Sequence, residues 1–332
     1  MKIAIVKLSA LGDIVHAMVV LQFITKYNPI IEIDWIVEES YKELLELNPD
    51  IQNVHVIDIK KARHKKSIYL LLSELKKMRK LGPYDLVIDL QGLMKSALIA
   101  RLIPSITTLG FNKFSIRESL ASIFYNKTFD YGYDENVIER NCALIKYALE
   151  IKFSNDKIEN KLAFLHSNYS YLNSNLSNTK KNIILVPGAS HKSKCYPILN
   201  LAKLTTMLDA NYIIIWGSKK EKVLADELKI LSPNVKVCEK LSINQLISLI
   251  SNINLVIGPD TGPTHMAWAL NVASITLFGP TPGYRNCYTT KINIAIESKS
   301  TVNPFKIDKN DLSIKDIDIH DVFRAAQKLL KQ

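Results

Sequence analysis

The chain has 332 residues and carries 43 Lys and Arg against 32 Asp and Glu, a formal charge of +11. This length suits two domains that each bury a core, and the charge favours acidic partners such as nucleotides, nucleic acid or an anionic membrane surface. Four scattered cysteines without a C-x-x-C pair indicate neither a disulfide framework nor a zinc knuckle. With no apolar run long enough to span a bilayer, we expect a soluble, cytoplasmic protein.

The first half of the chain alternates short apolar strands with helices, a pattern typical of a mainly parallel sheet. The predicted strands cover residues 2–6, 31–37, 54–59 and 86–90, and the predicted helices cover residues 14–26, 41–47 and 68–80. The stretch 167–181, rich in Asn and Ser, indicates a surface loop or linker. We therefore predict domains over residues 1–160 and 161–332.

The second half repeats the alternation. Strands are predicted at residues 182–186, 212–216, 255–259 and 273–278, and helices at 199–208, 221–231, 243–251 and 314–330. The last helix is expected to pack back on the N-terminal domain. The fold prediction is thus α/β, with two doubly wound, Rossmann-like domains facing across a cleft and ligands beyond the carboxyl ends of the strands.

The functional prediction depends most on one turn, at residues 258–262. An apolar run ending at Gly258 and Pro259 turns through Asp260, Thr261 and Gly262 and restarts as a helix that holds Pro263 and His265. The unpaired N–H groups and positive dipole end of such a helix suit a phosphate or diphosphate. The alternative is an ordinary strand-to-helix connection in which Thr or Asp only caps the helix.

The loop after the first strand contains only Gly12, and the chain holds neither G-x-G-x-x-G nor G-x-x-x-x-G-K-[ST]. This argues against a dehydrogenase and a P-loop NTPase. Asp13 at the start of the following helix is a candidate general base or, equally, a helix-capping carboxylate.

Other charged candidates follow strands of the second domain. Lys194 is placed to meet a phosphate, with Lys192 as its competitor and a merely solvated lysine as the alternative. Glu221 is a candidate for ribose hydroxyls or a first-turn helix glutamate. The cluster from Lys60 to Lys66 forms a basic patch, but no RNA-binding aromatic motif accompanies it.

The sequence resembles the lipopolysaccharide heptosyltransferases of glycosyltransferase family 9, most closely the type I enzymes. The matching segments are residues 7–16 (KLSALGDIVH), 34–39 (DWIVEE), 89–96 (DLQGLMKS), 117–122 (RESLAS), 260–265 (DTGPTH) and 278–281 (FGPT). The resemblance implies a glycosyltransferase B fold. It also implies metal-independent, inverting transfer of L-glycero-D-manno-heptose from ADP-heptose to the Kdo of Kdo-lipid A, by a monomer bound peripherally at the inner membrane.

The resemblance also implies roles for individual residues. Asp13 corresponds to the catalytic base. The residues implied to bind the donor are Ser190, Lys194, Glu221, Leu241, Asp260, Thr261, Gly262 and His265, with Asp260 on the heptose and Leu241 opening the adenine-pocket helix. Lys60, Arg63 and Arg117 become candidate contacts for the acidic acceptor.

Three alternatives remain open at the level of sequence. The first is heptosyltransferase II or another ADP-sugar transferase. The second is a nucleotide-sugar epimerase or hydrolase of the same architecture. The third is a basic RNA-binding protein, although the lead prediction involves no nucleic acid.

Overall fold

The computed structural model describes residues 1–170 and 175–331, which form two compact units, Met1–Phe164 and Leu165–Gln332. The sequence prediction placed the boundary a few residues earlier, between 160 and 161. Part of the predicted linker, residues 171–174, lies outside the described residues. On either side, residues 167–170 and 175–181 form neither helix nor strand.

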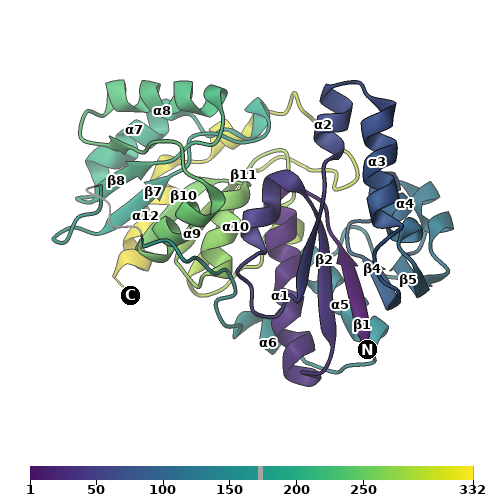
Figure 1. The fold of residues 1–332 in the computed structure, drawn as a ribbon. Helices are drawn as coiled ribbons and strands as arrows, with labels where there is room; N and C mark the ends of the chain where they lie inside the picture. Colours follow the sequence, from purple (N-terminus) through teal and green to yellow (C-terminus); the bar gives the residue numbers. More distant parts are fainter. Residues whose placement is uncertain (171–174, 332) are drawn as a thin grey trace. The chain divides into compact units, whose positions relative to one another are not determined.

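The N-terminal unit contains, in its described residues, a six-stranded sheet in the order β3-β2-β1-β4-β5-β6, and its neighbouring strands are parallel (Figure 1). The strands are β1 (Lys2–Val6), β2 (Glu32–Glu38), β3 (Asn53–Ile57), β4 (Tyr84–Asp89), β5 (Ser105–Phe111) and β6 (Lys127–Phe129). The α-helices are α1 (Leu11–Tyr27), α2 (Ile59–His64), α3 (Ile68–Met78), α4 (Met94–Leu102), α5 (Val137–Leu149) and α6 (Asp156–Glu159). Two 3-10 helices, η1 (Glu39–Leu44) and η2 (Ser119–Phe124), complete the unit.

Both faces of this sheet are covered, as expected for a parallel sheet. Ala4 and Val6 of β1 lie in one core with Met78 of α3 and Ile99 of α4. The side chains of Ile3 and Ile5 point to the opposite face of the strand and are also fully buried. This explains why β1 reads as a continuous apolar run.

The C-terminal unit repeats the design with the sheet order β12-β11-β10-β7-β8-β9, also parallel. Its strands are β7 (Asn182–Leu185), β8 (Asn211–Ile214), β9 (Lys236–Val237), β10 (Leu255–Pro259), β11 (Ser274–Phe278) and β12 (Asn293–Glu297). Its α-helices are α7 (Ile198–Met207), α8 (Lys219–Leu231), α9 (Ile243–Ser251), α10 (Gly262–Ala269), α11 (Gly283–Asn286) and α12 (Ile319–Leu330). The 3-10 helices are η3 (Lys192–Lys194) and η4 (Ser313–Asp316).

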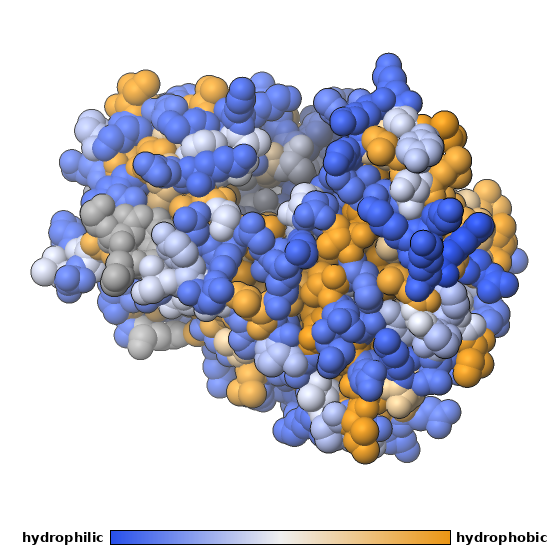
Figure 2. Space-filling view, in the orientation of Figure 1, coloured by the Kyte–Doolittle hydropathy of each residue, from blue (hydrophilic) through white to orange (hydrophobic). Residues whose placement is uncertain are grey.

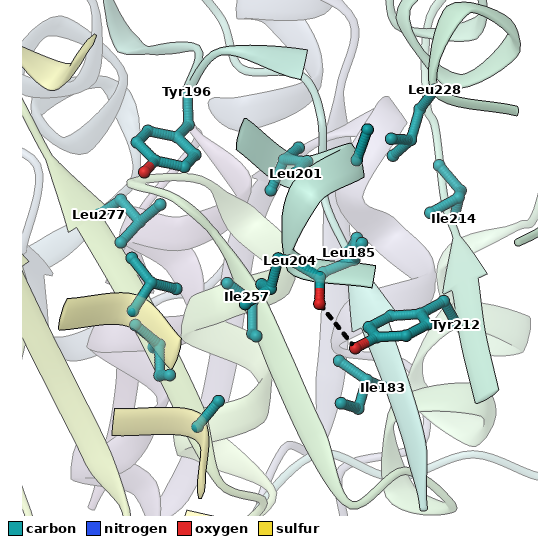
Figure 3. Packing of buried hydrophobic residues seen from close by; sticks show 14 of the residues in the cluster. Ile183, Leu185, Tyr196, Leu201, Leu204, Tyr212, Ile214, Leu228, Ile257 and Leu277 are labelled. Atoms are coloured by element: carbon teal, nitrogen blue, oxygen red, sulfur yellow. Dashed lines mark hydrogen bonds between the residues drawn. The ribbon is translucent and has the colours of Figure 1, made fainter. Parts of the chain in front are cut away.

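The core of this unit packs α7 onto the sheet (Figure 3). Leu201 and Leu204 of α7 lie against strand residues such as Ile183 and Ile257, and the Tyr212 hydroxyl donates to the Leu204 carbonyl at 3.2 Å. A buried tyrosine thus has a partner for its polar end within an otherwise apolar core.

The predicted C-terminal helix is corrected at its start. Residues 313–316 form η4, and α12 begins only at Ile319, because the Asp318 side chain accepts from the His320 N–H and caps a new helix. Val322, Ala326 and Leu329 of α12 are buried in the core of the C-terminal unit itself. The buried face of α12 therefore serves its own unit, and the packing of this helix on the N-terminal domain stays a prediction.

Candidate functional site

The parallel arrangement gathers the predicted site residues at one edge of each sheet. In the C-terminal unit, the carboxyl ends of β7, β8, β9 and β10 lead directly to Lys194, Glu221, Leu241 and Asp260. In the N-terminal unit, the carboxyl ends of β1, β3 and β5 lead to Asp13, to the basic helix α2 and to Arg117. These edges are where doubly wound folds bind ligands.

Asp260 is the centre of the polar cluster in the C-terminal unit. Its Oδ2 atom lies 2.7 Å from Lys194 Nζ and accepts from Thr281 Oγ1 at 3.0 Å and from Asn286 Nδ2 at 3.4 Å. Its Oδ1 atom lies 2.9 Å from His265 Nε2. The carboxylate is buried, and its orientation is fixed from several elements at once.

The electrostatic balance of this cluster favours the ionised carboxylate. Burial raises the pKa of Asp260, but the Lys194 charge and the hydrogen bonds from His265 and Lys194 outweigh it and hold the pKa well below its usual range. Conversely, burial and the neighbouring Asp260 charge raise the pKa of the Cys287 thiol to about 12, so that thiol is neutral. Asp260 is therefore a fixed anion that can accept hydrogen bonds from sugar hydroxyls.

Helix α10 begins directly beside this cluster. Thr261 is its N-cap, Gly262 its first residue and Pro263 a first-turn residue, as the sequence pattern indicated. The Thr264 hydroxyl donates to the Thr261 carbonyl at 2.7 Å and shapes the turn from β10. The positive end of the α10 dipole lies at the edge where a diphosphate is expected.

The loop after β7 separates the two competing lysines. Lys192 and Ser190 are exposed, whereas the Lys194 side chain is largely buried against Asp260. The His191 ring lies 3.0 Å from the Ser193 hydroxyl and helps to hold the η3 turn that aims Lys194 inward. Of the two lysines, the structure brings Lys194 into the Asp260 cluster.

Glu221 lies in the first turn of α8 and accepts from the Gly217 and Ser218 N–H groups at 2.6 and 3.0 Å. Glu221 is therefore the first-turn helix glutamate that the sequence offered as one of its two interpretations. The Glu221 side chain also packs closely against the loop after β7, because a Cβ on Gly188 would lie 2.3 Å from Glu221 Cγ and 3.2 Å from its carboxyl carbon. Leu241 is half-buried just before Ser242, the residue that caps α9.

At the N-terminal edge, Asp13 is exposed in the first turn of α1. Its Oδ2 atom accepts from the Ala10 N–H at 3.1 Å, so this aspartate also helps to cap its own helix. Gln91 Oε1 accepts from the N–H groups of Leu8 and Ser9 at 2.8 and 3.2 Å and ties the Asp13 loop to the end of β4. Asp13 is accessible, and its loop is fixed by hydrogen bonds.

The basic cluster that begins at Lys60 is helical in its first part. Residues 59–64 form α2, which Asp58 caps, and the Lys60 N–H donates to the buried carboxylate of Glu38 at 2.7 Å. The Lys60 ammonium lies 2.8 Å from Ser40 Oγ and 4.3 Å from the Tyr41 ring centre. Arg63 and Arg117 are exposed. All three cations stand at the edge that carries Asp13.

Sequence reasoning gave no role to three side chains that shape these edges, although two of them, Gln91 and Thr281, lie in the segments that carry the family resemblance. Thr281 and Asn286 hold Asp260, and Gln91 holds the Asp13 loop. Their positions gave a further signal, since Thr281 follows β11 and Gln91 follows β4, and each of these strands is adjacent to one already assigned to the site. Side-chain hydrogen bonds between separate loops leave no periodic trace in the sequence.

Among residues 1–170 and 175–331, no three His, Cys, Asp or Glu side chains are grouped so that they could hold a metal ion. Metal independence stays a prediction. Within the same residues, no helix combines the length and apolar character needed to cross a membrane.

Two doubly wound parallel sheets, with polar side chains gathered at the carboxyl edges, define the class of this protein: an α/β protein of glycosyltransferase B type, as the sequence predicted. Residues 73–310 match the model of glycosyltransferase family 9 (heptosyltransferase). The lipopolysaccharide heptosyltransferase 1 of Campylobacter coli is 37% identical over an alignment of 348 positions that covers 99% of each chain. The chain therefore belongs to glycosyltransferase family 9 and is a glycosyltransferase.

Two solved structures agree in fold. Escherichia coli heptosyltransferase WaaC with ADP superposes with a TM-score of 0.80 at 24% identity, covering 99% of this chain and 100% of that one. WaaC with ADP-2-deoxy-2-fluoro heptose gives a TM-score of 0.77 at 24% identity, covering 99% of both chains.

Proposed function

We propose that the protein is a heptosyltransferase I, which transfers L-glycero-D-manno-heptose from ADP-heptose to the Kdo of Kdo-lipid A. One observation in the structure supports the donor most directly: Lys194 and His265 converge on Asp260 beside the N-terminus of α10. This arrangement joins groups suited to a diphosphate with an anion suited to sugar hydroxyls. The Campylobacter coli relative carries the same name, and the WaaC structure holds an ADP-heptose analogue.

The donor half of the reaction is assigned to the C-terminal edge. The bond from the anomeric carbon to the diphosphate oxygen breaks, and its electron pair stays on the diphosphate. Lys194 and the dipole of α10 stabilise this growing charge. Asp260, oriented by His265 and Thr281, holds the heptose, while Glu221 receives the ribose and Ser190 a phosphate oxygen.

The acceptor half is assigned to the N-terminal edge. The Kdo hydroxyl oxygen attacks the anomeric carbon from the face opposite the leaving diphosphate and inverts the centre, and Asp13 takes the hydroxyl proton. General base catalysis of this kind contributes about 10²–10⁴ in rate. Lys60, Arg63 and Arg117 are assigned to the carboxylate and phosphates of the acceptor. We further propose a monomer without a metal cofactor, bound peripherally at the cytoplasmic face of the inner membrane.

A transfer assay with two acceptors tests this proposal. We expect the purified protein to add one heptose from ADP-heptose to Kdo-lipid A, seen by mass spectrometry in the presence of a chelator. Preference for an acceptor that already carries heptose would assign the type II reaction instead. Free heptose or an epimer, formed at catalytic rates from ADP-heptose alone, would assign a hydrolase or epimerase.

A further inference from the structure

Three packed elements of the N-terminal unit expose apolar side chains on their outer faces. Helix α3 packs against α4, and α4 packs against η2. We call their shared exposed surface the basic apolar face. Its apolar members are Ile68, Tyr69 and Leu72 of α3, Met94 and Leu98 of α4, and Leu120 and Ile123 of η2.

The spacing of these side chains shows that they form an ordered outward face and are not isolated exposed residues. Ile68 and Leu72 stand one helical turn apart, as do Met94 and Leu98, so each helix presents an apolar stripe outward. Met78 is the buried residue of α3, whereas Ile68 and Leu72 are 74% and 57% exposed. Figure 2 shows apolar groups interrupting the hydrophilic surface over α3 and beside α4.

Cations predominate in the segments that carry the apolar stripes. Residues 59–81 contain nine Lys or Arg and one acid, and residues 94–124 contain four Lys or Arg and one acid. Both acids have partners, because Glu74 pairs with Lys77 at 2.5 Å and Glu118 accepts from the Met94 N–H at 2.7 Å. Lys76, Lys95 and Arg101 are exposed on the same helices as the stripes.

Exposed apolar side chains together with an excess of positive charge favour one class of partner, an anionic bilayer, over a second copy of the chain. A two-fold contact between copies would set the same surface against itself, and the cations would then face each other. An anionic bilayer offers opposite charge for the lysines and an apolar layer for the leucines, as it does for interfacial amphipathic helices. Tyr69, 78% exposed, suits the depth of the lipid headgroups.

We infer that the basic apolar face docks the protein on the surface of an anionic phospholipid bilayer. The inference rests on the proposed function, which already includes a lipid-anchored acceptor and peripheral membrane binding, and it adds the surface that makes the contact. The face adjoins the edge assigned to that acceptor: Met94 follows the β4 loop that holds Ser9, and Glu118, next to Arg117, caps α4. Docking therefore brings the Asp13 edge to the bilayer surface, where the acceptor headgroup lies.

Vesicle co-sedimentation of the full chain tests the inference without turnover. We expect wild type to bind vesicles of phosphatidylethanolamine with phosphatidylglycerol and to bind phosphatidylcholine vesicles weakly, with binding reduced at high salt. The variant Ile68→Glu/Leu72→Glu should lower the partition coefficient roughly tenfold or more. A second variant, Leu120→Glu/Ile123→Glu, tests another element of the face if the first one fails to fold.

The control variant Leu199→Glu/Ile230→Glu changes two residues of α7 and α8 that are 62% and 79% exposed and adds the same charge. It should bind vesicles like wild type. Wild-type protein that ignores anionic vesicles, or face variants that bind as wild type does, would overturn the inference. A wild-type dimer that Ile68→Glu/Leu72→Glu dissociates, with vesicle binding unchanged, would make the face a contact between copies and also overturn it.

Transfer assays separate docking from the proposed function. On a Kdo acceptor without acyl chains, Ile68→Glu/Leu72→Glu should turn over within about twofold of wild type, whereas on vesicle-embedded acceptor it should fall about as far as binding does. If wild type transfers to no acceptor, the proposed function fails. Loss of vesicle binding in the face variants would still support docking in that case.

Discussion

The two sheet edges hold their key carboxylates in opposite ways. Asp260 is buried, and Lys194, His265 and Thr281 fix both of its oxygens. Asp13 is exposed and is held by the N–H of Ala10 in its own helix turn. A buried, fully partnered carboxylate shapes a binding surface in advance, whereas an exposed one can exchange a proton with a bound substrate. The comparison predicts that substitutions of Asp260 affect folding and donor binding together, and those of Asp13 affect chemistry alone.

The largest expected effect is a loss of kcat on substitution of Asp13, without a change in the stability of the fold. Asp13→Asn should lower kcat by about 10²–10⁴, because the amide cannot take the acceptor proton. The melting temperature and the affinity for ADP should stay near wild type, since the side chain is exposed. Steady-state transfer kinetics and calorimetry with ADP measure the two effects separately. An Asp13→Asn enzyme of normal kcat would falsify the assignment of the base.

Asp260 should show the opposite behaviour. Asp260→Asn leaves the largely buried Lys194 ammonium without its counter-charge, which typically costs about 3–5 kcal/mol of unfolding free energy. Urea unfolding of Asp260→Asn, Lys194→Met and the double variant measures the coupling of the pair. We expect the double variant to be more stable than the sum of the single effects predicts. Strict additivity would show that the two groups do not interact in solution.

A third carboxylate sharpens the comparison, because it is buried but distant from the carboxyl edge. Asp34, near the amino end of β2, accepts from Asn53 and Tyr84 and contacts His55 at 2.9 Å. Burial raises the pKa of Asp34, but these hydrogen bonds outweigh it and lower the pKa from 3.8 to about 2. The stabilisation is therefore fully present above pH 4 and is lost as the pH falls through the interval from 3.8 to about 2.

Asp34→Asn should remove about 2 kcal/mol of unfolding free energy at neutral pH and reduce the acid dependence in that interval. Unfolding measured from pH 7 to pH 2 in both proteins isolates the contribution, because the depressed pKa of Asp260 acts equally in each. The kcat of the folded variant at neutral pH should match wild type. A selective loss of kcat would show that Asp34 takes part in catalysis and would contradict the purely stabilising role that we assign to it.

The sequence predicted most of the fold through periodicity. Strands β1 and β10 and helix α9 have the predicted bounds, and most other predicted strands and helices occur within a few residues. The exceptions are the broken C-terminal helix and the helix predicted over residues 41–47, where the structure has the 3-10 helix η1 (Glu39–Leu44). In the second unit β9, α11 and β12 were not predicted, and no element was predicted between residues 91 and 166, where the structure has α4, β5, η2, β6, α5 and α6. Exposed apolar residues such as Leu98 and Ile106 blur the usual contrast between inward and outward positions there.

The candidate site was predictable where a residue directly follows a strand. Asp260, Glu221 and Asp13 could be found in this way, because parallel strands bring their carboxyl ends to one edge. The choice between Lys192 and Lys194 could not, since it depends on the η3 turn that directs Lys194 to Asp260. The hydrogen bonds from Thr281 and Asn286 likewise depend on how the β10 and β11 loops meet in space.

A backbone substitution tests how closely the donor edge is packed. Gly188→Ala would place a methyl group 2.3 Å from Glu221 Cγ and displace that carboxylate from the β7 loop. We expect the donor KM to rise about tenfold, the cost of a lost hydrogen bond to a charged group, with a smaller change in kcat. Gly217→Ala is the matched control, because its Cβ would come no closer than 3.3 Å to Glu221. Equal effects of the two substitutions would contradict the assignment of Glu221 to the ribose.

The smallest expected effects belong to the acceptor cations. Lys60→Ala, Arg63→Ala and Arg117→Ala should each raise the KM for a soluble Kdo acceptor by up to about fivefold, because single exposed charges contribute roughly 0–1 kcal/mol. Lys60→Ala should have the largest effect of the three, since Ser40 and Tyr41 hold its ammonium in place and less entropy is lost on binding. The donor KM should not change in any of them.

Salt dependence distinguishes these cations from the buried donor cluster. Raising the ionic strength should increase the wild-type acceptor KM and leave that of the triple variant nearly constant, because exposed charges are screened and buried pairs much less so. Lys203→Ala, which removes an exposed lysine of α7, is the control and should retain the wild-type salt response. If the triple variant kept that response as well, the acidic acceptor would have to be recognised by other cations, and the contrast between an exposed acceptor edge and a buried donor edge would rest on Asp13 alone.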